Sequence, residues 1–114
     1  MAKKKVVVLA RRSPTNTRHS AEALRQSIGL TLAPNDVTVI LMDSAAWLAV
    51  PGVGGDEIQK HLDTLKLLKV TVAAEEDALA RYGVPREEVP PHIVILGPEK
   101  IGETLAAAEA VIAF

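Results

Sequence analysis

The chain has 114 residues, a formal net charge of −1 and no cysteine, with 48% hydrophobic and 24% charged residues. This length supports one hydrophobic core, so we expect a single domain over residues 1–114. The balanced charge and the small number of aromatic residues argue against a nucleic-acid-binding protein, which needs a basic surface or stacking platforms. The lack of cysteine excludes disulfides, thiol catalysis and thiolate metal sites.

The hydrophobic stretches bear on where the protein works. The longest of them are strand-length, far below the ~20 residues that a helix needs to span a bilayer. The first residues also lack the pattern of a secretory signal peptide. We therefore expect a cytoplasmic protein without a membrane partner.

Five short apolar runs recur along the chain, at residues 5–10, 37–42, 70–74, 92–96 and 110–114. Runs that are apolar throughout predict strands buried on both faces, which is typical of parallel sheets. Between them lie helical patterns, whose expected inner faces are Ala21, Leu24, Ile28 and Leu32, then Ile58, Leu62, Leu65 and Leu68, and last Ile101, Leu105 and Ala108. Because helices that cross between parallel strands cover both faces of a sheet, the pattern predicts a three-layer α/β/α sandwich.

Several residues mark where the helices should begin. Asn16 or Thr17 is expected to cap the first helix, and Asp56 with Gln59 resembles a capping box. Pro98 is suited to the first position of the last long helix.

A short helix holding Trp47 is predicted after the second strand, with Asp43 and Ser44 as its cap. The glycines of residues 52–55 follow it and predict a flexible turn or a mobile flap, because no Lys-Ser/Thr pair follows them as in a nucleotide-binding loop. Trp47 is expected to anchor its helix on the sheet or on a neighbouring subunit.

The polar loop after the first strand is one candidate site. Its anion-binding candidates are Arg11, Arg12, Ser13, Thr15 and Asn16. Free N–H groups at a helix start, with two guanidiniums nearby, suit an anion. The alternative, which we favour from sequence, is an ordinary capped loop with solvent-facing arginines.

Three acids, Glu75, Glu76 and Asp77, form the second candidate site, at the start of a predicted helix that ends at Gly83. Acids in a first helical turn stabilise the helix dipole, and this is the favoured explanation. The alternative is that Glu75, at the end of a parallel strand, faces a cleft as an acid, base or hydrogen-bond acceptor, because ligands of open α/β sheets bind there.

The three histidines, at positions 19, 61 and 92, are too widely spaced for a compact metal-ligand motif. We therefore expect neither a metal nor a cofactor.

Three separate segments resemble the DsrE/DsrF/DsrH and TusB/TusC/TusD proteins of sulfur relay. They are residues 5–9 with the polar loop and helix that follow, residues 65–84, and the final residues 110–114, which end in phenylalanine as in that family. Residues 65–84 look most like the DsrF/TusC branch. The resemblance implies a five-stranded parallel sheet ordered 4-3-2-1-5 and assembly into trimers or hexamers, homomeric or mixed with related DsrE-family subunits.

In that family the residue just after the third strand can be a persulfide-carrying cysteine. Here the equivalent position, counted back from Gly83, is Glu75, and no other cysteine can substitute for it. The sequence therefore predicts an oligomeric, non-catalytic assembly or binding subunit that is not a cysteine-dependent sulfurtransferase. Trp47 and the apolar turn at residues 50–53 are the expected sources of self-association. The alternative is a small enzyme or ligand-binding regulatory module that acts on an anionic metabolite or nucleotide near Glu75 and the Arg11/Arg12 loop.

Overall fold

Strands and helices alternate along the chain, and each of the five predicted apolar runs forms a strand. The computed structural model describes residues 3–11 and 17–114. The strands are β1 (Lys4–Ala10), β2 (Asn35–Leu41), β3 (Thr71–Glu75), β4 (Ile93–Leu96) and β5 (Ala110–Ala113). The helices are α1 (Thr17–Leu30), α2 (Asp56–Leu67), α3 (Glu76–Arg81) and α4 (Pro98–Ala107), with two 3₁₀ helices, η1 (Asp43–Ala49) and η2 (Arg86–Glu88).

The strands form one sheet in the order β4-β3-β2-β1-β5, and every neighbouring pair is parallel. One row of paired residues runs across all five strands, through Ile112, Val8, Val39, Val72 and Ile93. The strand order and the parallel pairing confirm the fold that was expected from the resemblance.

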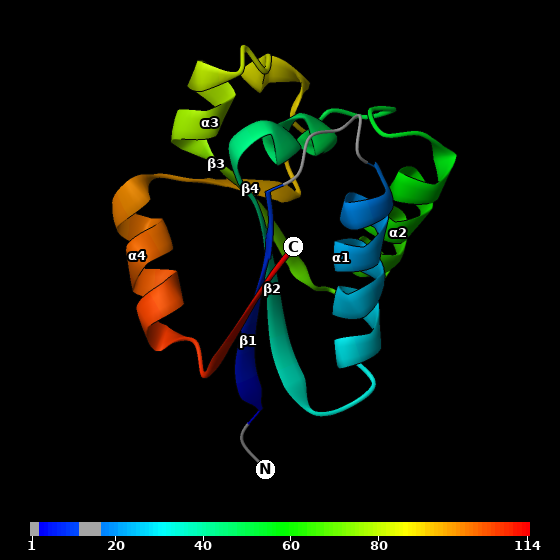
Figure 1. The fold of residues 1–114 in the computed structure, drawn as a ribbon, viewed down its shortest axis with the longest axis vertical. Coiled ribbons are helices and arrows are strands. Elements are labelled where there is room, and N and C mark those ends of the chain that lie inside the picture. Colours follow the sequence, from blue (N-terminus) through cyan, green and yellow to red (C-terminus); the bar gives the residue numbers. More distant parts are fainter. Residues whose placement is uncertain (1–2, 12–16) are drawn as a thin grey trace.

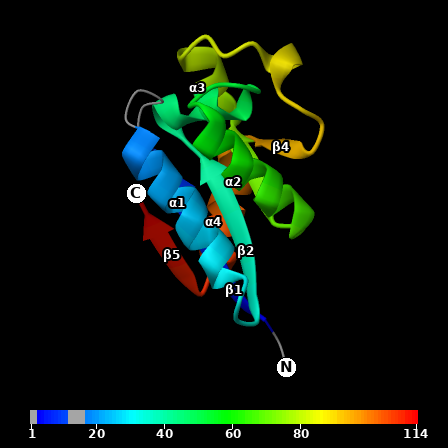
Figure 2. The ribbon, with the colours of Figure 1, turned by 90° about the vertical axis from the view of Figure 1, so that its right-hand side faces the viewer.

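The helices make three layers with this sheet. Helices α1 and α2 lie on one face and α4 lies on the other (Figure 1). The view in Figure 2 shows α1 and α2 side by side in front of the sheet. Helix α3 and η1 lie beyond the carboxyl ends of the strands (Figure 1). The predicted α/β/α sandwich is therefore confirmed, and its carboxyl edge is covered by short helices.

Both sheet faces are buried, which explains why the strands are apolar throughout. On the face of α1 and α2, the larger core includes Val8, Leu24, Val39, Leu65 and Val72. On the opposite face, a smaller core joins the sheet to α4 through Val7, Ile40, Ala73 and Ile101. Neighbouring residues of one strand enter different cores because successive side chains point to opposite faces.

Two residues expected on inner helix faces lie outside them. Leu32 is 91% exposed, because α1 ends at Leu30 and continues as a tight turn that precedes Pro34. Leu68 is 46% exposed at the carboxyl end of α2. There, Lys69 takes a left-handed φ of 60°, and the N–H of residue 70 donates to the carbonyl of residue 65 at 3.0 Å. This hydrogen bond ends the helix at Leu67, one residue before the last residue of the predicted apolar face.

Two of the predicted caps are wrong and one helix start is confirmed. Helix α2 begins after Gly55, and no side chain caps it; Gln59 instead donates from Nε2 to the Val53 carbonyl at 3.1 Å. Helix η1 forms where the short Trp47 helix was expected, but neither Asp43 nor Ser44 caps it. Pro98 is the first residue of α4, as predicted. Residue 16 and the side chain of Thr17, the expected caps of α1, lie outside the part that the structure describes.

None of the helices in the described part of the chain combines the length and the apolar character required to cross a bilayer.

Candidate functional site

Glu75 lies where the sequence predicted it, at the carboxyl end of β3, and its half-buried side chain bonds to another element. Its Oε1 accepts a hydrogen bond from the backbone N–H of Asp43 at 3.1 Å. Asp43 is the first residue of η1 and has a left-handed φ of 50°. The first N–H groups of a helix lack partners within the helix. Glu75 therefore caps η1, the neighbouring helix, and makes no side-chain cap to its own helix α3.

The register of the sheet explains this contact. Leu41 of β2 pairs with Ala74 of β3, so the next residues, Met42 and Glu75, lie beside each other where the two strands end. The chain turns into η1 immediately after Met42, which brings the Asp43 amide to the carboxylate. Sequence reasoning missed this partner because the donor is a backbone N–H, which no residue type reveals.

The other two acids of this segment have different surroundings. Glu76 accepts a hydrogen bond from Arg86 Nη1 at 3.0 Å, which ties α3 to η2. Both side chains are about half exposed, so this ion pair contributes less than ~1 kcal/mol. Asp77 is exposed in the first turn of α3. The three acids therefore do not converge on one point, and the explanation from helix-start stabilisation suits Glu76 and Asp77 better than Glu75.

A second contact holds α3 against η1. The Nε1 of Trp47 donates to the Tyr82 carbonyl at the end of α3, at 3.1 Å. Gly83 ends that helix with a φ of 68°, and the Val84 N–H donates to the Leu79 carbonyl at 2.9 Å. Trp47 also packs on the larger core. Its anchoring role is thus fulfilled within the chain.

Arg11, the first residue of the arginine loop, directly follows β1. Arg11 is exposed, and its backbone N–H donates to the Phe114 carbonyl at 3.3 Å, beside the edge strand β5. The remaining candidates of this loop lie outside the described residues: Arg12, Ser13, Thr15 and Asn16. Whether the loop binds an anion therefore stays a prediction.

Arg11 and Glu75 share a face of the sheet and are separated by one strand. Continuing the register one step beyond the ladder places Arg11, Met42 and Glu75 in one row on the side of α4. Because β2 separates β1 from β3, the backbones of Arg11 and Glu75 are about 10 Å apart. Neither residue lines any of five well-formed cavities in the part of the chain that the structure describes.

The histidines are also dispersed. His19 and His92 are exposed, and His61 Nε2 lies 3.6 Å from an oxygen of Glu57 on the preceding turn of α2. Across residues 3–11 and 17–114, no group of three or more His, Cys, Asp or Glu side chains is arranged to hold a metal ion.

The cap made by Glu75 leads to a testable stability difference. Glu75→Ala is expected to lower the free energy of unfolding by about 1–2 kcal/mol, because the half-buried Asp43 N–H loses its acceptor. Glu75→Gln keeps an acceptor oxygen and should lower it by less than ~1 kcal/mol. Urea unfolding followed by Trp47 fluorescence measures both. Asp77→Ala, in the same helix start, is the control, with an expected loss of about 0.5 kcal/mol. Equal losses for the two alanine variants would contradict the capping role.

Comparisons with known proteins agree with this fold. No protein-family model matches the sequence, and no curated protein does. The structure is similar to the crystal structure of the ychN protein from E. coli, with a TM-score of 0.85 and 22% identity over 97% of this chain and 99% of that one. It is also similar to BT1422, a conserved protein of unknown function from Bacteroides thetaiotaomicron, with a TM-score of 0.71 and 16% identity over 97% and 95% of the two chains. The chain therefore has the same α/β fold as the ychN protein.

Proposed function

We propose that this protein is a non-catalytic, self-associating subunit of the DsrE/DsrF-like group that serves assembly or binding in the cytoplasm and carries no persulfide. The observation behind the proposal is the residue at the end of β3. Where the resembled family can carry a cysteine, this chain has Glu75, and the carboxylate of Glu75 accepts the Asp43 N–H. Persulfide chemistry requires a thiolate. The likeness of residues 65–84 to the DsrF/TusC branch extends the proposal to that branch.

Self-association is supported by a different surface from the one that the sequence suggested. Val50 is buried, and Val53 and Trp47 pack on the larger core, so these residues are largely covered within one chain. Apolar side chains are instead exposed on both edge strands: Val94 on β4 at 44%, and Val111 and Ile112 on β5 at 47% and 36%. Strand β5 carries no charged residue, although edge charges commonly prevent association.

Two unlike edges on one subunit suit a closed ring. If the β4 side of one copy meets the β5 side of the next, the contact is heterologous, and a rotation that closes produces a ring. A trimer, or a hexamer built from two trimers, is the assembly that we propose. Related DsrE-family subunits would fit the same edges in a mixed assembly.

Light scattering tests the assembly. At tens of micromolar protein, we expect a mass three or six times that of the 12.1 kDa chain. Val111→Lys places a charge on the exposed edge strand and should shift the mass to that of the single chain, while changing the free energy of unfolding by no more than ~0.5 kcal/mol. Leu67→Lys is the control, because Leu67 is 82% exposed on α2 and belongs to neither edge strand. A monomeric parent protein would contradict the proposal.

The alternative function is binding or turnover of an anionic metabolite or nucleotide near Glu75 and Arg11. The common face of these two residues favours it, but the carboxylate is already engaged with Asp43. A thermal-shift screen of anionic metabolites and nucleotides distinguishes the two functions, because a ligand at a hundredfold excess over its Kd adds about 2.7 kcal/mol to stability. A Glu75→Gln variant that melts like the parent but no longer responds to an identified ligand would establish the alternative.

A further inference from the structure

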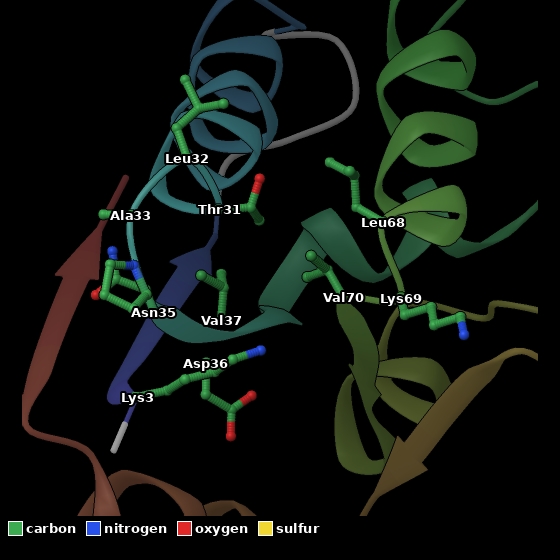
Figure 3. A pocket seen from close by; sticks show the side chains of 11 residues that line it. Lys3, Thr31, Leu32, Ala33, Asn35, Asp36, Val37, Leu68, Lys69 and Val70 are labelled. Atoms are coloured by element: carbon green, nitrogen blue, oxygen red, sulfur yellow. The ribbon is translucent and has the colours of Figure 1, made fainter. Parts of the chain in front are cut away.

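The amino ends of the strands, opposite the edge that holds Glu75, carry two adjoining cavities. The first, of about 370 Å³, is formed by the turn between α1 and β2, the start of β2 and the end of α2 (Figure 3). The second, of about 220 Å³, extends toward β4 and is lined in part by Lys66, Thr71, His92 and Val94. Lys69 and Val70 line both cavities. We call the two together the amino-end groove.

Two large apolar side chains of the amino-end groove are exposed to solvent. Leu32 is 91% exposed and Leu68 is 46% exposed, and both line the first cavity. Figure 3 shows Leu32, Thr31 and Leu68 around one part of the cavity, with Val37 and Val70 near its centre. Val37 is buried and Val70 is half-buried. An apolar side chain placed there would remove both leucines from water, which is favourable.

The charge of the groove is predominantly positive. Lys3 lines the first cavity, Lys66 the second and Lys69 both, whereas Asp36 is the one carboxylate among the residues that line them. None of the ion pairs within the described residues uses these three lysines. In Figure 3, Lys3 lies beside Asp36, while Lys69 extends away from them on the other side of the cavity. An occupant with several negative charges spread along its length would match this arrangement.

We propose that the amino-end groove binds an extended acidic segment of a partner protein that carries one large apolar side chain. The apolar side chain enters the first cavity between Leu32 and Leu68, and flanking carboxylates pair with Lys3, Lys66 and Lys69. Two cavities in a line suit an extended peptide better than a compact metabolite. Their concave shape suits a peptide better than a flat membrane surface. The proposal names a partner class for the binding role proposed above and rests on it. Val94 of edge strand β4 belongs to both surfaces, whereas the three lysines that carry the test lie outside both edge strands.

Fluorescence anisotropy with a labelled synthetic peptide, Glu-Asp-Leu-Glu-Asp, tests the groove. The parent protein should bind it saturably, and more weakly as salt rises, because exposed ion pairs are screened. The triple variant Lys3→Gln, Lys66→Gln, Lys69→Gln should bind about tenfold more weakly, the factor expected when three exposed ion pairs are lost.

Two matched comparisons separate the groove from general electrostatics. A control variant removes three exposed cations outside the groove, by Lys60→Gln, Arg81→Gln and Lys100→Gln, and should change the affinity by less than about twofold. A peptide with serine in place of leucine should bind the parent about fivefold more weakly, because the first cavity then receives no apolar side chain.

Three outcomes of the binding measurements would overturn the proposal. They are a lack of saturable binding by the parent protein, equal weakening by the two triple variants, and binding to phosphatidylserine vesicles without binding to the peptide. Light scattering on the same samples distinguishes the proposed groove from the proposed assembly. If the triple lysine variant of the groove keeps the mass of the parent but loses peptide binding, the groove is supported. If the parent is monomeric and still binds the peptide, only the assembly is contradicted. A groove variant that changes mass would assign this surface to self-association and would also overturn the proposal.

Discussion

Gly54→Ala is expected to lower the free energy of unfolding by about 3 kcal/mol. Gly54 has a φ of 91°, a region that costs an L-residue roughly 1–2 kcal/mol. A Cβ at this position would also lie 2.9 Å from Leu48 Cδ2, 3.0 Å from Ile58 Cγ1 and 3.2 Å from Ile58 Cβ. Leu48 and Ile58 are each 1% exposed, so neither can move away freely, and forcing extra volume into such a core costs about 1–3 kcal/mol.

Gly52→Ala separates the two causes of this loss. Gly52 has nearly the same φ, 90°, but nothing lies within 4 Å of a Cβ built there. This variant should therefore lose only the backbone contribution, roughly 1–2 kcal/mol. Urea unfolding followed by Trp47 fluorescence provides both values. If the two variants were equally stable, the close approach of Gly54 to η1 and α2 would contribute nothing.

The turn at residues 51–55 shows what a glycine-rich sequence reveals and what it leaves hidden. Its composition predicted a turn, and the structure has one. The contact of Gly54 with Leu48 and Ile58 depends on how η1 is placed against α2. That placement is a tertiary property, because it joins two elements that pack on the larger core. Composition alone does not distinguish a glycine that is required by close packing, such as Gly54, from one that is required only by its positive φ, such as Gly52.

The strands were predictable from sequence, and the helix ends were less so. Continuous apolar runs indicate strands buried on both faces, and all five of them form the parallel sheet. The strand order, in contrast, came from the family resemblance. Helix α2 ends at Leu67, and the left-handed residue that follows its C-cap is Lys69, at a position where glycine is the usual signal. The spacing of apolar residues therefore included Leu68 in the predicted inner face of α2, whereas Leu68 is exposed in the structure.

The candidate site was predictable in its location and not in its contacts. A strand followed by acids places Glu75 at the carboxyl edge of a parallel sheet, where the structure has it. The Asp43 amide that it binds belongs to a segment 32 residues earlier in the chain. The contact arises from the pairing of β2 with β3 and from the turn after Met42. A sequence pattern identifies side chains, so it does not reveal a backbone donor that a neighbouring strand supplies.

The parent protein is expected to gain no sulfur when it is incubated with a persulfide donor, whereas Glu75→Cys is expected to gain one sulfur atom. A persulfide forms when a thiolate attacks the outer sulfur of the donor and the donor leaves as a thiolate, and the parent has no cysteine to do this. Intact-protein mass spectrometry, with and without a reductant, measures the gain. A reproducible, reductant-sensitive gain of sulfur mass in the parent would refute its proposed inability to carry a persulfide.

Glu75→Ser is the matched control for this gain, since it places an oxygen where the cysteine variant places sulfur, with almost the same size. Both variants lose the acceptor for the Asp43 N–H, so both should lose about 1–2 kcal/mol of stability. The cysteine and serine variants should therefore differ only in the sulfur mass that they gain from the donor. The side chain of Glu75 is half-buried at the end of β3 and therefore accessible to a donor. A folded Glu75→Cys variant that gained no sulfur would show that a donor does not reach this position, and the comparison with the persulfide-carrying position of the sulfur-relay proteins would then fail.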